Sequence, residues 1–398
     1  MSEKMKVLLA DKLPEQYVQK LKDHDLEVIN EPKLGENDLP EAAKDVDIII
    51  VRSTVVNAAT IENAEKLNLI IRAGAGYNNI DVAAANKKGI YVANCPGKNA
   101  IAVAELAMGL IISLDRQIPD NVTDFRAGKW NKAAYSKGNG LYGKTIAIVG
   151  LGNIGREVAI RAKAFGMNVY GKDISRIEGV EYKDFSEFDQ VLPIADVVSL
   201  HLPVTPNTKG LFDEKMFSYM KDGAYFINTS RSGVVVEDAL IKAVKEKGIK
   251  AGLDVFADEP EGKTGEVKSK LQGVDGIYVT HHIGASTEQA QNAVAEEAVK
   301  IILDFINSGV IGHWVNRAKL TDSHFQLVVK HFDKPGVLAS IMDVLRTGDI
   351  NIEEVENIIF DGGVVACCTM KLKESATNDM LAGIRNNPNV ITVSHTSL

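Results

Sequence analysis

Short apolar runs alternate with polar, amphipathic stretches over most of the chain, and this alternation predicts strands separated by helices. The runs rich in β-branched or small apolar residues are 6–10, 46–51, 69–71, 89–93, 144–149, 168–170, 196–200, 224–227, 251–253 and 277–280. Strands that are apolar along their whole length are buried on both faces, as in parallel sheets covered by helices. We therefore expect an α/β fold with doubly wound parallel sheets.

Two long helical patterns divide this region, and a different pattern follows it. The first, 100–114, is expected to link one strand–helix unit to the next, and the second spans 287–307. From His324 onward the order strand, helix, strand, strand, helix, strand is typical of a small ferredoxin-like α+β domain. The predicted domains are 1–97 with 287–318, then 98–286, and finally 319–398.

Composition narrows the class of protein. A net charge of −8 over 398 residues gives no electrostatic footprint for nucleic acid. No apolar stretch approaches the ~20 residues that cross a bilayer, and the first residues lack the apolar core of a signal peptide. The three cysteines, Cys95, Cys367 and Cys368, form no metal-binding spacing. We expect a cytoplasmic protein with no bound metal and no membrane partner.

A glycine-rich turn follows the apolar run at 144–149. It reads Gly150-Leu-Gly152-Asn153-Ile154-Gly155 and opens a helical pattern. The first glycine permits a tight turn, the second lets a pyrophosphate approach the backbone, and the third lets helix and strand pack closely. The N–H groups of a helix N-terminus favour an anion there. This Rossmann-type signature predicts a dinucleotide site.

The strand after this turn ends at an acidic residue, Asp173. A carboxylate about 20 residues beyond the turn accepts hydrogen bonds from the ribose hydroxyls and repels a 2′-phosphate. NAD is therefore the expected cofactor, although the neighbouring Lys172 and Arg176 weaken the preference over NADP.

A second turn, Arg72-Ala-Gly74-Ala-Gly76, also follows a strand but has no third glycine. The strand after it, which ends at 94–96, carries no acid. We interpret this turn as a substrate-anion site, in which free N–H groups near Gly74 and the side chain of Arg72 receive a negative group.

Three stretches with acid–base chemistry follow strands of the second unit. They are Asn228–Arg231, Asp254–Pro260 and His281–Ala285. Ligands of open α/β sheets bind at the carboxyl ends of the strands, so these stretches are expected to meet at one edge. Hydride transfer from a secondary alcohol needs a base, a group that holds the substrate and a group that tunes the base.

Together these stretches resemble the D-isomer-specific 2-hydroxyacid dehydrogenase family over the first ~315 residues. The resemblance implies a flavodoxin-like substrate-binding domain beside the Rossmann-type NAD-binding domain. It implies that Arg231 holds the substrate carboxylate, that His282 is the acid/base, and that Glu259 hydrogen-bonds this histidine. His281 stands where relatives commonly have proline, so the match is His282 and a structural role is expected for His281.

The same resemblance assigns residues to the ligands. Asp254 matches the position that contacts the nicotinamide carboxamide, and further cofactor contacts are implied for Thr205, Ser230, Gly284 and Ala285. In the 3-phosphoglycerate dehydrogenases of this family, arginines matching Arg52 and Arg72 hold the phosphate and carboxylate, and Lys132 is a further candidate.

The C-terminal pattern resembles an ACT domain, a small effector-binding module of amino-acid metabolism. The matching serine contacts would be His331, Asp333 and Asn351, and Asp333 replaces the asparagine usual in serine-sensing examples. The alternative is an ACT domain that serves only for oligomerisation.

The resemblance as a whole implies NAD-dependent oxidation of 3-phospho-D-glycerate to 3-phosphohydroxypyruvate, the first step of the phosphorylated pathway of L-serine biosynthesis. A homodimer that exchanges residues 100–126, or a homotetramer extended by ACT pairing, is expected. The alternatives are a glyoxylate or hydroxypyruvate reductase of the same family, a non-catalytic NAD-sensing protein and a pure amino-acid sensor.

Overall fold

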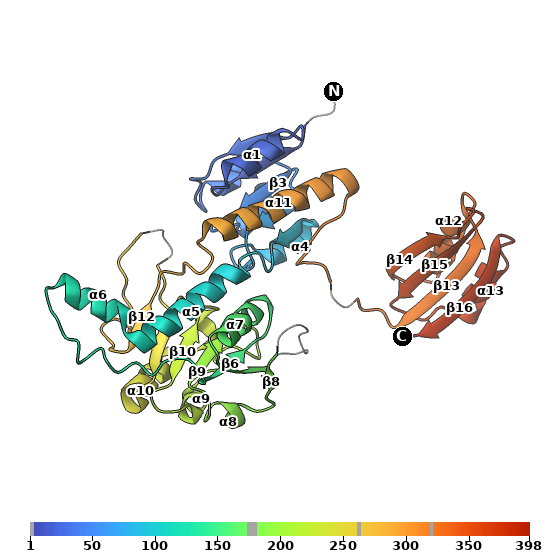
Figure 1. Cartoon of the computed structure of the whole chain (residues 1–398). Coiled ribbons are helices and arrows are strands. Elements are labelled where there is room, and N and C mark those ends of the chain that lie inside the picture. Colours follow the sequence, from blue (N-terminus) through green and yellow to red (C-terminus); the bar gives the residue numbers. More distant parts are fainter. Residues whose placement is uncertain (1–3, 173–180, 261–263, 319–320) are drawn as a thin grey trace. The chain divides into compact units, whose positions relative to one another are not determined.

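The computed structural model describes residues 4–172, 181–260, 264–318 and 321–398. Their contacts divide the chain into two units, Met1–Asn316 and Arg317–Leu398 (Figure 1). No helix within the described ranges is long and apolar enough to span a membrane.

A five-stranded parallel sheet of order β2-β1-β3-β4-β5 forms the first part of the larger unit. Its elements are β1 (Lys6–Leu9), α1 (Glu15–Lys22), β2 (Glu27–Asn30), α2 (Leu39–Ala42), β3 (Ile48–Val51), α3 (Ala58–Asn63), β4 (Leu69–Arg72), α4 (Val82–Lys88) and β5 (Tyr91–Asn94). The predicted strands are present. β2 was not predicted because it is a short, part-exposed edge strand with polar ends. The strand expected from residue 89 begins at Tyr91, because Gly89 ends α4 in a left-handed conformation.

The strand order of this sheet creates a switch point between β1 and β3. These strands are neighbours, yet the chain moves outward to β2 before it returns to β3. Asp11 lies just beyond β1 and Arg52 directly beyond β3, while Arg72 is the last residue of β4. Crevices outside the carboxyl ends of strands at such a point are where open α/β sheets bind ligands.

A seven-stranded parallel sheet of order β12-β11-β10-β9-β6-β7-β8 forms the second part. Its elements are β6 (Thr145–Val149), α7 (Asn153–Ala164), β7 (Asn168–Lys172), β8 (Lys183–Asp184), α8 (Phe188–Val191), β9 (Val197–Leu200), α9 (Glu214–Tyr219), β10 (Tyr225–Asn228), the 3₁₀ helix η1 (Ser232–Val234), α10 (Glu237–Lys247), β11 (Lys250–Leu253) and β12 (Ile277–Val279). The switch point here lies between β6 and β9, and the glycine turn follows β6.

Three helices connect the two sheets. α5 (Ala100–Arg116) packs with α7 on the second sheet, and α6 (Ile118–Arg126) follows it. α11 (Glu288–Ser308) returns to the first sheet, where Val299 and Ile302 are fully buried against its strands (Figure 1). Each such side chain contributes about 1.5–3 kcal/mol by burial. The doubly wound α/β class is confirmed, while the domain boundaries at 97/98, 286/287 and 318/319 stay predictions.

The C-terminal unit has the predicted order of strands and helices. Its elements are β13 (Phe325–Phe332), α12 (Val337–Thr347), β14 (Ile352–Ile359), β15 (Val365–Leu372), α13 (Asn378–Arg385) and β16 (Val390–Ser397). The sheet is antiparallel, with strand order β14-β15-β13-β16. Alternate residues of β13 and β15, among them Leu327, Val329 and Met370, form a core with Ile341 and Leu345 of α12. The small α+β domain expected from the sequence is therefore present.

Candidate active site

The turn after β10 is fixed by a buried amide. Asn228 is 1% exposed, and its Oδ1 accepts hydrogen bonds from the Ser230 N–H at 3.0 Å and the Ser230 hydroxyl at 2.8 Å. Its Nδ2 donates to the Arg231 carbonyl at 3.0 Å. The amide therefore sets the direction in which Arg231 leaves the strand. Ser230, predicted to contact the cofactor, uses its hydroxyl proton on Asn228.

Arg231 points from this turn toward the first sheet. Its Nη1 donates to the Ser230 carbonyl at 2.7 Å. Its Nη2 lies only 2.3 Å from the place where a Cβ on Gly76 would stand. Glycine at position 76 is therefore what admits the guanidinium. Burial lowers the pKa of Arg231, and the nearby Glu259 carboxylate opposes this shift.

The predicted anion turn brings more positive charge to the same place. A Cβ on Gly74 would stand 1.6 Å from Nη1 of Arg72, so the turn wraps this guanidinium closely. The Nε of Arg72 is buried and has no hydrogen-bond partner among the described residues. Burial, followed by repulsion from Arg231 and Arg52, lowers the pKa of Arg72 to about 10. Three arginines from three loops thus share one region.

Two predictions for this region stay predictions, and the structure adds the contacts of the residues concerned. The Gly74 N–H is not free, because it donates to the Arg72 carbonyl at 2.7 Å and closes a tight turn. The positive charge therefore comes from side chains rather than from this amide. Lys132 lies in the exposed segment between α6 and β6, and its ammonium makes no hydrogen bond or ion pair within the described ranges. A contact of Lys132 with the substrate stays a prediction.

Glu259 and His282 form a close pair. Oε2 of Glu259 lies 2.7 Å from Nδ1 of the histidine, and Oε1 accepts from the Phe256 N–H at 3.0 Å. The hydrogen bond that His282 donates to Glu259 raises the pKa of His282, and burial opposes this shift. The His282 side chain is still 53% exposed, so its ring can reach a ligand. This geometry fits an imidazole that is oriented on one nitrogen and free to exchange a proton on the other.

Asp254 holds the loop that carries His282. It is 1% exposed, and its Oδ1 accepts from the Thr280 hydroxyl at 2.6 Å and the Ile283 N–H at 2.9 Å. Oδ2 accepts from the Gly284 N–H at 2.8 Å, and the Asp254 carbonyl accepts from the His282 N–H at 3.0 Å. The loop can therefore keep His282 in a left-handed conformation, with φ of 51°. A nicotinamide contact of Asp254 stays a prediction.

Three loops that are far apart in the chain converge at this edge. Arg231, Glu259 and His282 lie close enough that each carboxylate or guanidinium shifts the pKa of a neighbour. His281 is exposed and is not part of the Glu259 pair. The sequence did not single out Asn228 as the residue that orders the Arg231 turn. The available signal was a polar residue at the end of an otherwise apolar strand.

The glycine turn after β6 has the shape of an anion cradle. Gly150 has φ of 93°, and a Cβ there would stand 2.5 Å from the His201 carbonyl oxygen. A Cβ on Gly155 would stand 2.0 Å from the Gly150 carbonyl oxygen, whereas one on Gly152 would meet nothing within 4 Å. α7 begins after Gly152 with no side-chain cap, which leaves its first N–H groups open. An open turn with free N–H groups at a helix N-terminus suits the approach of a pyrophosphate.

The other predicted cofactor residues surround this turn or lie outside the described residues. Asn153 and Ile154 form the first turn of α7, and the Asn153 amide faces Gly97 of the first sheet's last loop. Thr205 is exposed and shares a 3.0 Å hydrogen bond with the Thr208 hydroxyl. Gly284 is buried and Ala285 half-buried beside Asp254. Asp173 lies outside the described residues.

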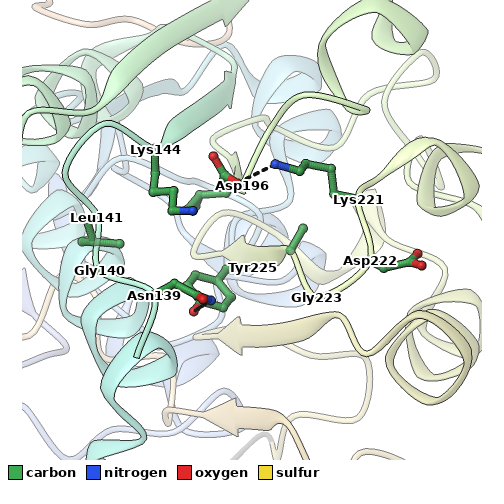
Figure 2. Close-up of a pocket in the computed structure, with 11 residues that line it drawn as sticks. Asn139, Gly140, Leu141, Lys144, Asp196, Lys221, Asp222, Gly223 and Tyr225 are labelled. Atoms are coloured by element: carbon green, nitrogen blue, oxygen red, sulfur yellow. Dashed lines mark hydrogen bonds and ion pairs between the residues drawn. The ribbon is translucent and has the colours of Figure 1, made fainter. Parts of the chain in front are cut away.

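A separate polar pocket lies at the opposite edge of the second sheet. It has a volume of about 220 Å³ and is lined by residues that precede β6, β9 and β10, including Lys144, Asp196 and Lys221 (Figure 2). Lys221 pairs with Asp196 at 2.6 Å, so charge inside the pocket is balanced. Because it lies at the amino ends of the strands, it is not the site at which the three loops meet.

The predicted effector residues of the C-terminal unit are not joined by a hydrogen bond. His331 is 1% exposed, and its ring nitrogens contact the Phe332 carbonyl at 2.9 Å and the Asn357 Oδ1 at 3.2 Å. Asn351 donates to Glu353 at 2.7 Å, and Asp333 is exposed. The His331 ring is thus committed to its own unit.

Comparison with known proteins places this geometry in a family. Residues 108–284 match the model of the D-isomer specific 2-hydroxyacid dehydrogenase NAD binding domain, a range that includes the glycine turn and all three loops. A D-3-phosphoglycerate dehydrogenase of Methanocaldococcus jannaschii is 36% identical over 96% of this chain and 72% of its own length. A hydroxypyruvate reductase of Thermotoga maritima is 42% identical over 70% of this chain and 90% of its own length.

Solved structures similar to this chain include a dehydrogenase of the same name as the first relative. The NAD⁺-bound 3-phosphoglycerate dehydrogenase of Entamoeba histolytica has 29% identity and a TM-score of 0.66, over 79% of this chain and 99% of its own. The cofactor of the chain is NAD. Its glycine turn, its parallel sheets and its similarity to full-length relatives lead to one assignment: the chain belongs to the D-isomer specific 2-hydroxyacid dehydrogenase family.

Proposed function

We propose that the chain catalyses NAD-dependent oxidation of 3-phospho-D-glycerate to 3-phosphohydroxypyruvate, the first step of the phosphorylated pathway of L-serine biosynthesis. The observation that carries this proposal is the group of three arginines, Arg52, Arg72 and Arg231, around one glycine turn. One carboxylate needs one bidentate guanidinium. A substrate with a carboxylate and a phosphate carries a charge of about −3 and can occupy all three.

The side chains have complementary roles in this reaction. Arg231 holds the substrate carboxylate and keeps the carbinol carbon in place. His282 takes the hydroxyl proton on Nε2, since its Nδ1 is bonded to Glu259. The bound nicotinamide supplies the acceptor for the hydride that leaves the carbinol carbon. In the reverse direction His282 returns the proton to the carbonyl oxygen of the keto acid.

Glu259 helps the histidine to carry charge. A carboxylate beside an imidazole stabilises the imidazolium that forms when the substrate hydroxyl loses its proton. Arg231 lowers the pKa of His282, but the hydrogen bond to the Glu259 carboxylate has the larger effect and the pKa is raised. The pair therefore favours uptake of the proton during oxidation.

The relative from Thermotoga maritima supports a second candidate, reduction of hydroxypyruvate or glyoxylate, which carry no phosphate. The deciding experiment compares kcat/KM for 3-phosphohydroxypyruvate, hydroxypyruvate and glyoxylate with NADH, for the wild type and for Arg52→Ala. We expect the phosphorylated acid to be preferred and Arg52→Ala to abolish that preference. The exposed Arg385 gives a control, Arg385→Ala, which should change neither value.

Preference of the wild type for a plain keto acid would refute the phosphate assignment. No oxidation of NADH with any of the acids would instead favour a non-catalytic NAD-sensing protein.

We infer further that the C-terminal unit is an ACT domain that binds serine, and that the enzyme is a homodimer or homotetramer. The β-α-β-β-α-β order and the exposed Asp333 and Asn351 support this inference. Because the His331 ring is committed internally, Asp333 and Asn351 are expected to give the larger effects on mutation. Serine inhibition of wild type, Asp333→Ala and Asn351→Ala tests the site, and light scattering tests the assembly. Activity that serine leaves unchanged would leave oligomerisation as the domain's role.

A further inference from the structure

Asp11 is a buried carboxylate that the proposed chemistry does not use. It is 6% exposed and stands directly beyond β1. Its Oδ2 accepts from the backbone N–H groups of Arg52 at 2.7 Å, Ser53 at 2.8 Å and Thr54 at 2.9 Å. Its Oδ1 accepts from the Ser53 hydroxyl at 3.0 Å. One carboxylate thus accepts from all three backbone N–H groups of the loop and from the Ser53 hydroxyl.

The far side of this loop is tied down as well. Asn79 donates from Nδ2 to the Thr54 carbonyl at 2.7 Å, and its own carbonyl accepts from the Val56 N–H at 2.8 Å. The loop backbone is therefore held from two directions. The Arg52 side chain at its start has no hydrogen bond or ion pair in the part of the chain that the structure describes. A rigid backbone that presents an unpaired guanidinium is a prepared anion site.

The contact between Asp11 and the Arg52 loop lies where a ligand is expected to bind. β1 and β3 are the neighbouring strands at the switch point of the first sheet, so Asp11 and Arg52 lie at its ligand-binding crevice. Arg52 lowers the pKa of Arg72 and Asp11 raises it, so the three side chains lie in one region of this crevice. Asp11 accepts hydrogen bonds from three backbone N–H groups and the Ser53 hydroxyl. It forms no ion pair with either arginine in the described structure.

We propose that Asp11 is a positioning residue for the distal phosphate of the substrate: it orders the Arg52–Thr54 loop and so aims the Arg52 guanidinium without neutralising it. This inference rests on the proposed function, because it assumes that Arg52 holds the phosphate. A carboxylate suits the task because its hydrogen bonds to N–H groups are charge-assisted and strong. An arginine–carboxylate ion pair in its place would cancel the charge that the phosphate needs.

The protonation state of Asp11 agrees with this role. Burial by itself would raise the pKa of the carboxyl, but the hydrogen bonds from Thr54, Arg52 and Ser53 outweigh burial and lower it. The group is therefore ionised throughout the neutral range. The negative charge of Asp11 also raises the pKa of Arg72, which opposes the repulsion of Arg72 by Arg231 and Arg52.

The test measures KM and kcat with NADH for 3-phosphohydroxypyruvate and for hydroxypyruvate, in wild type, Asp11→Asn, Arg52→Ala and the double variant. We expect Asp11→Asn to raise KM for the phosphorylated acid about tenfold, as a loss of about 1.4 kcal/mol gives. Its kcat and KM for hydroxypyruvate should stay within about twofold of the wild type. The double variant should match Arg52→Ala, because Asp11 acts through Arg52.

Two further variants provide a second test of the Asp11 role and a control for loss of stability. Ser53→Ala removes one donor and keeps the carboxylate, so a smaller rise in KM confined to the phosphorylated acid should appear even if Asp11→Asn folds poorly. Asp81→Asn is the matched control, because Asp81 also accepts a backbone N–H, from Ala84 at 2.9 Å, but at the start of α4. It should lower stability without separating the two substrates.

The outcomes distinguish the inference from the function on which it rests. If Arg52→Ala is selective for the phosphorylated acid while Asp11→Asn and Ser53→Ala impair both acids equally, the positioning role is wrong and the function stands. The same holds if the effects of Asp11→Asn and Arg52→Ala add in full. If Arg52→Ala does not separate the acids, the proposed function and the inference fail together.

Discussion

Oε2 of Glu259 lies 2.7 Å from Nδ1 of His282, and this contact orients the ring on which the chemistry depends. With Nδ1 committed to the carboxylate, Nε2 is the nitrogen available to a substrate oxygen. The same contact raises the pKa of His282, so the imidazolium persists to higher pH than in a free histidine. Reduction of a keto acid needs this protonated form, whereas oxidation of the alcohol needs the neutral one.

The first prediction concerns pH. The rate of keto-acid reduction should fall as pH rises through the pKa of His282, because the proton donor is lost. Replacing Glu259 by Gln removes the group that raises this pKa, so the falling limb of kcat/KM should move to lower pH. Above neutral pH we expect kcat/KM to drop about tenfold or more. The exposed neighbour gives a control, Asp258→Asn, which should keep the wild-type profile. An unshifted profile in Glu259→Gln would contradict the assigned pair.

The two adjacent histidines allow a second, internally matched test. His282→Ala should lower kcat by about 10²–10⁴-fold, the usual range for loss of a general acid–base group. NADH binding, followed by fluorescence, should survive because the glycine turn is untouched. His281→Ala should keep most activity, since in the described structure the histidine that pairs with Glu259 is His282. The reverse ranking of the two variants would move the acid/base role to His281.

A third prediction separates folding from cofactor binding within one turn. Gly155→Ala places a Cβ 2.0 Å from the Gly150 carbonyl, so it should destabilise the protein. Overpacking of this kind costs about 1–3 kcal/mol. Gly152→Ala meets no protein atom within 4 Å, so its melting temperature should stay near the wild-type value while NADH affinity falls. Calorimetry and fluorescence titration give the two values. Normal NADH binding by Gly152→Ala would show that the pyrophosphate lies elsewhere.

The buried Nε of Arg72, which has no hydrogen-bond partner in the described part of the chain, leads to a fourth prediction. A multivalent anion should relieve repulsion among the three arginines and stabilise the native state. Inorganic phosphate at ten times its Kd would add about 1.4 kcal/mol to the free energy of unfolding. Arg72→Met keeps much of the apolar bulk but should lose most of this gain. Sodium chloride at equal ionic strength is the control for screening. A phosphate effect that is unchanged in Arg72→Met would place the bound anion away from this turn.

The sequence predicted the elements whose signals are local. Fully apolar runs marked β3, β6 and β9, and the glycine spacing after β6 marked the cofactor turn, because each depends on a few adjacent residues. β2 escaped prediction, since its edge position leaves Glu27 and Asn30 in a strand without an apolar pattern. Family resemblance, rather than pattern, distinguished His282 from His281.

Contacts between distant segments could not be read from spacing. Asp11 and the Arg52 loop are 41 residues apart in sequence and meet only because β1 and β3 pair. A cofactor contact of Asp254 stays a prediction, and the structure adds that its carboxylate orders the loop of His282. Free N–H groups are predicted near Gly74, and spacing does not show that the N–H of Gly74 itself donates to the Arg72 carbonyl. Each of these depends on where side chains meet after folding.

The left-handed backbone at His282 lowers the stability of the fold at a residue that catalysis needs. A non-glycine residue with φ of 51° is held there by the loop around Asp254, and such conformations cost roughly 1 kcal/mol or more. Glycine at this position would release that cost and also remove the imidazole. His282 is therefore a position at which folding would gain from a substitution that turnover cannot tolerate.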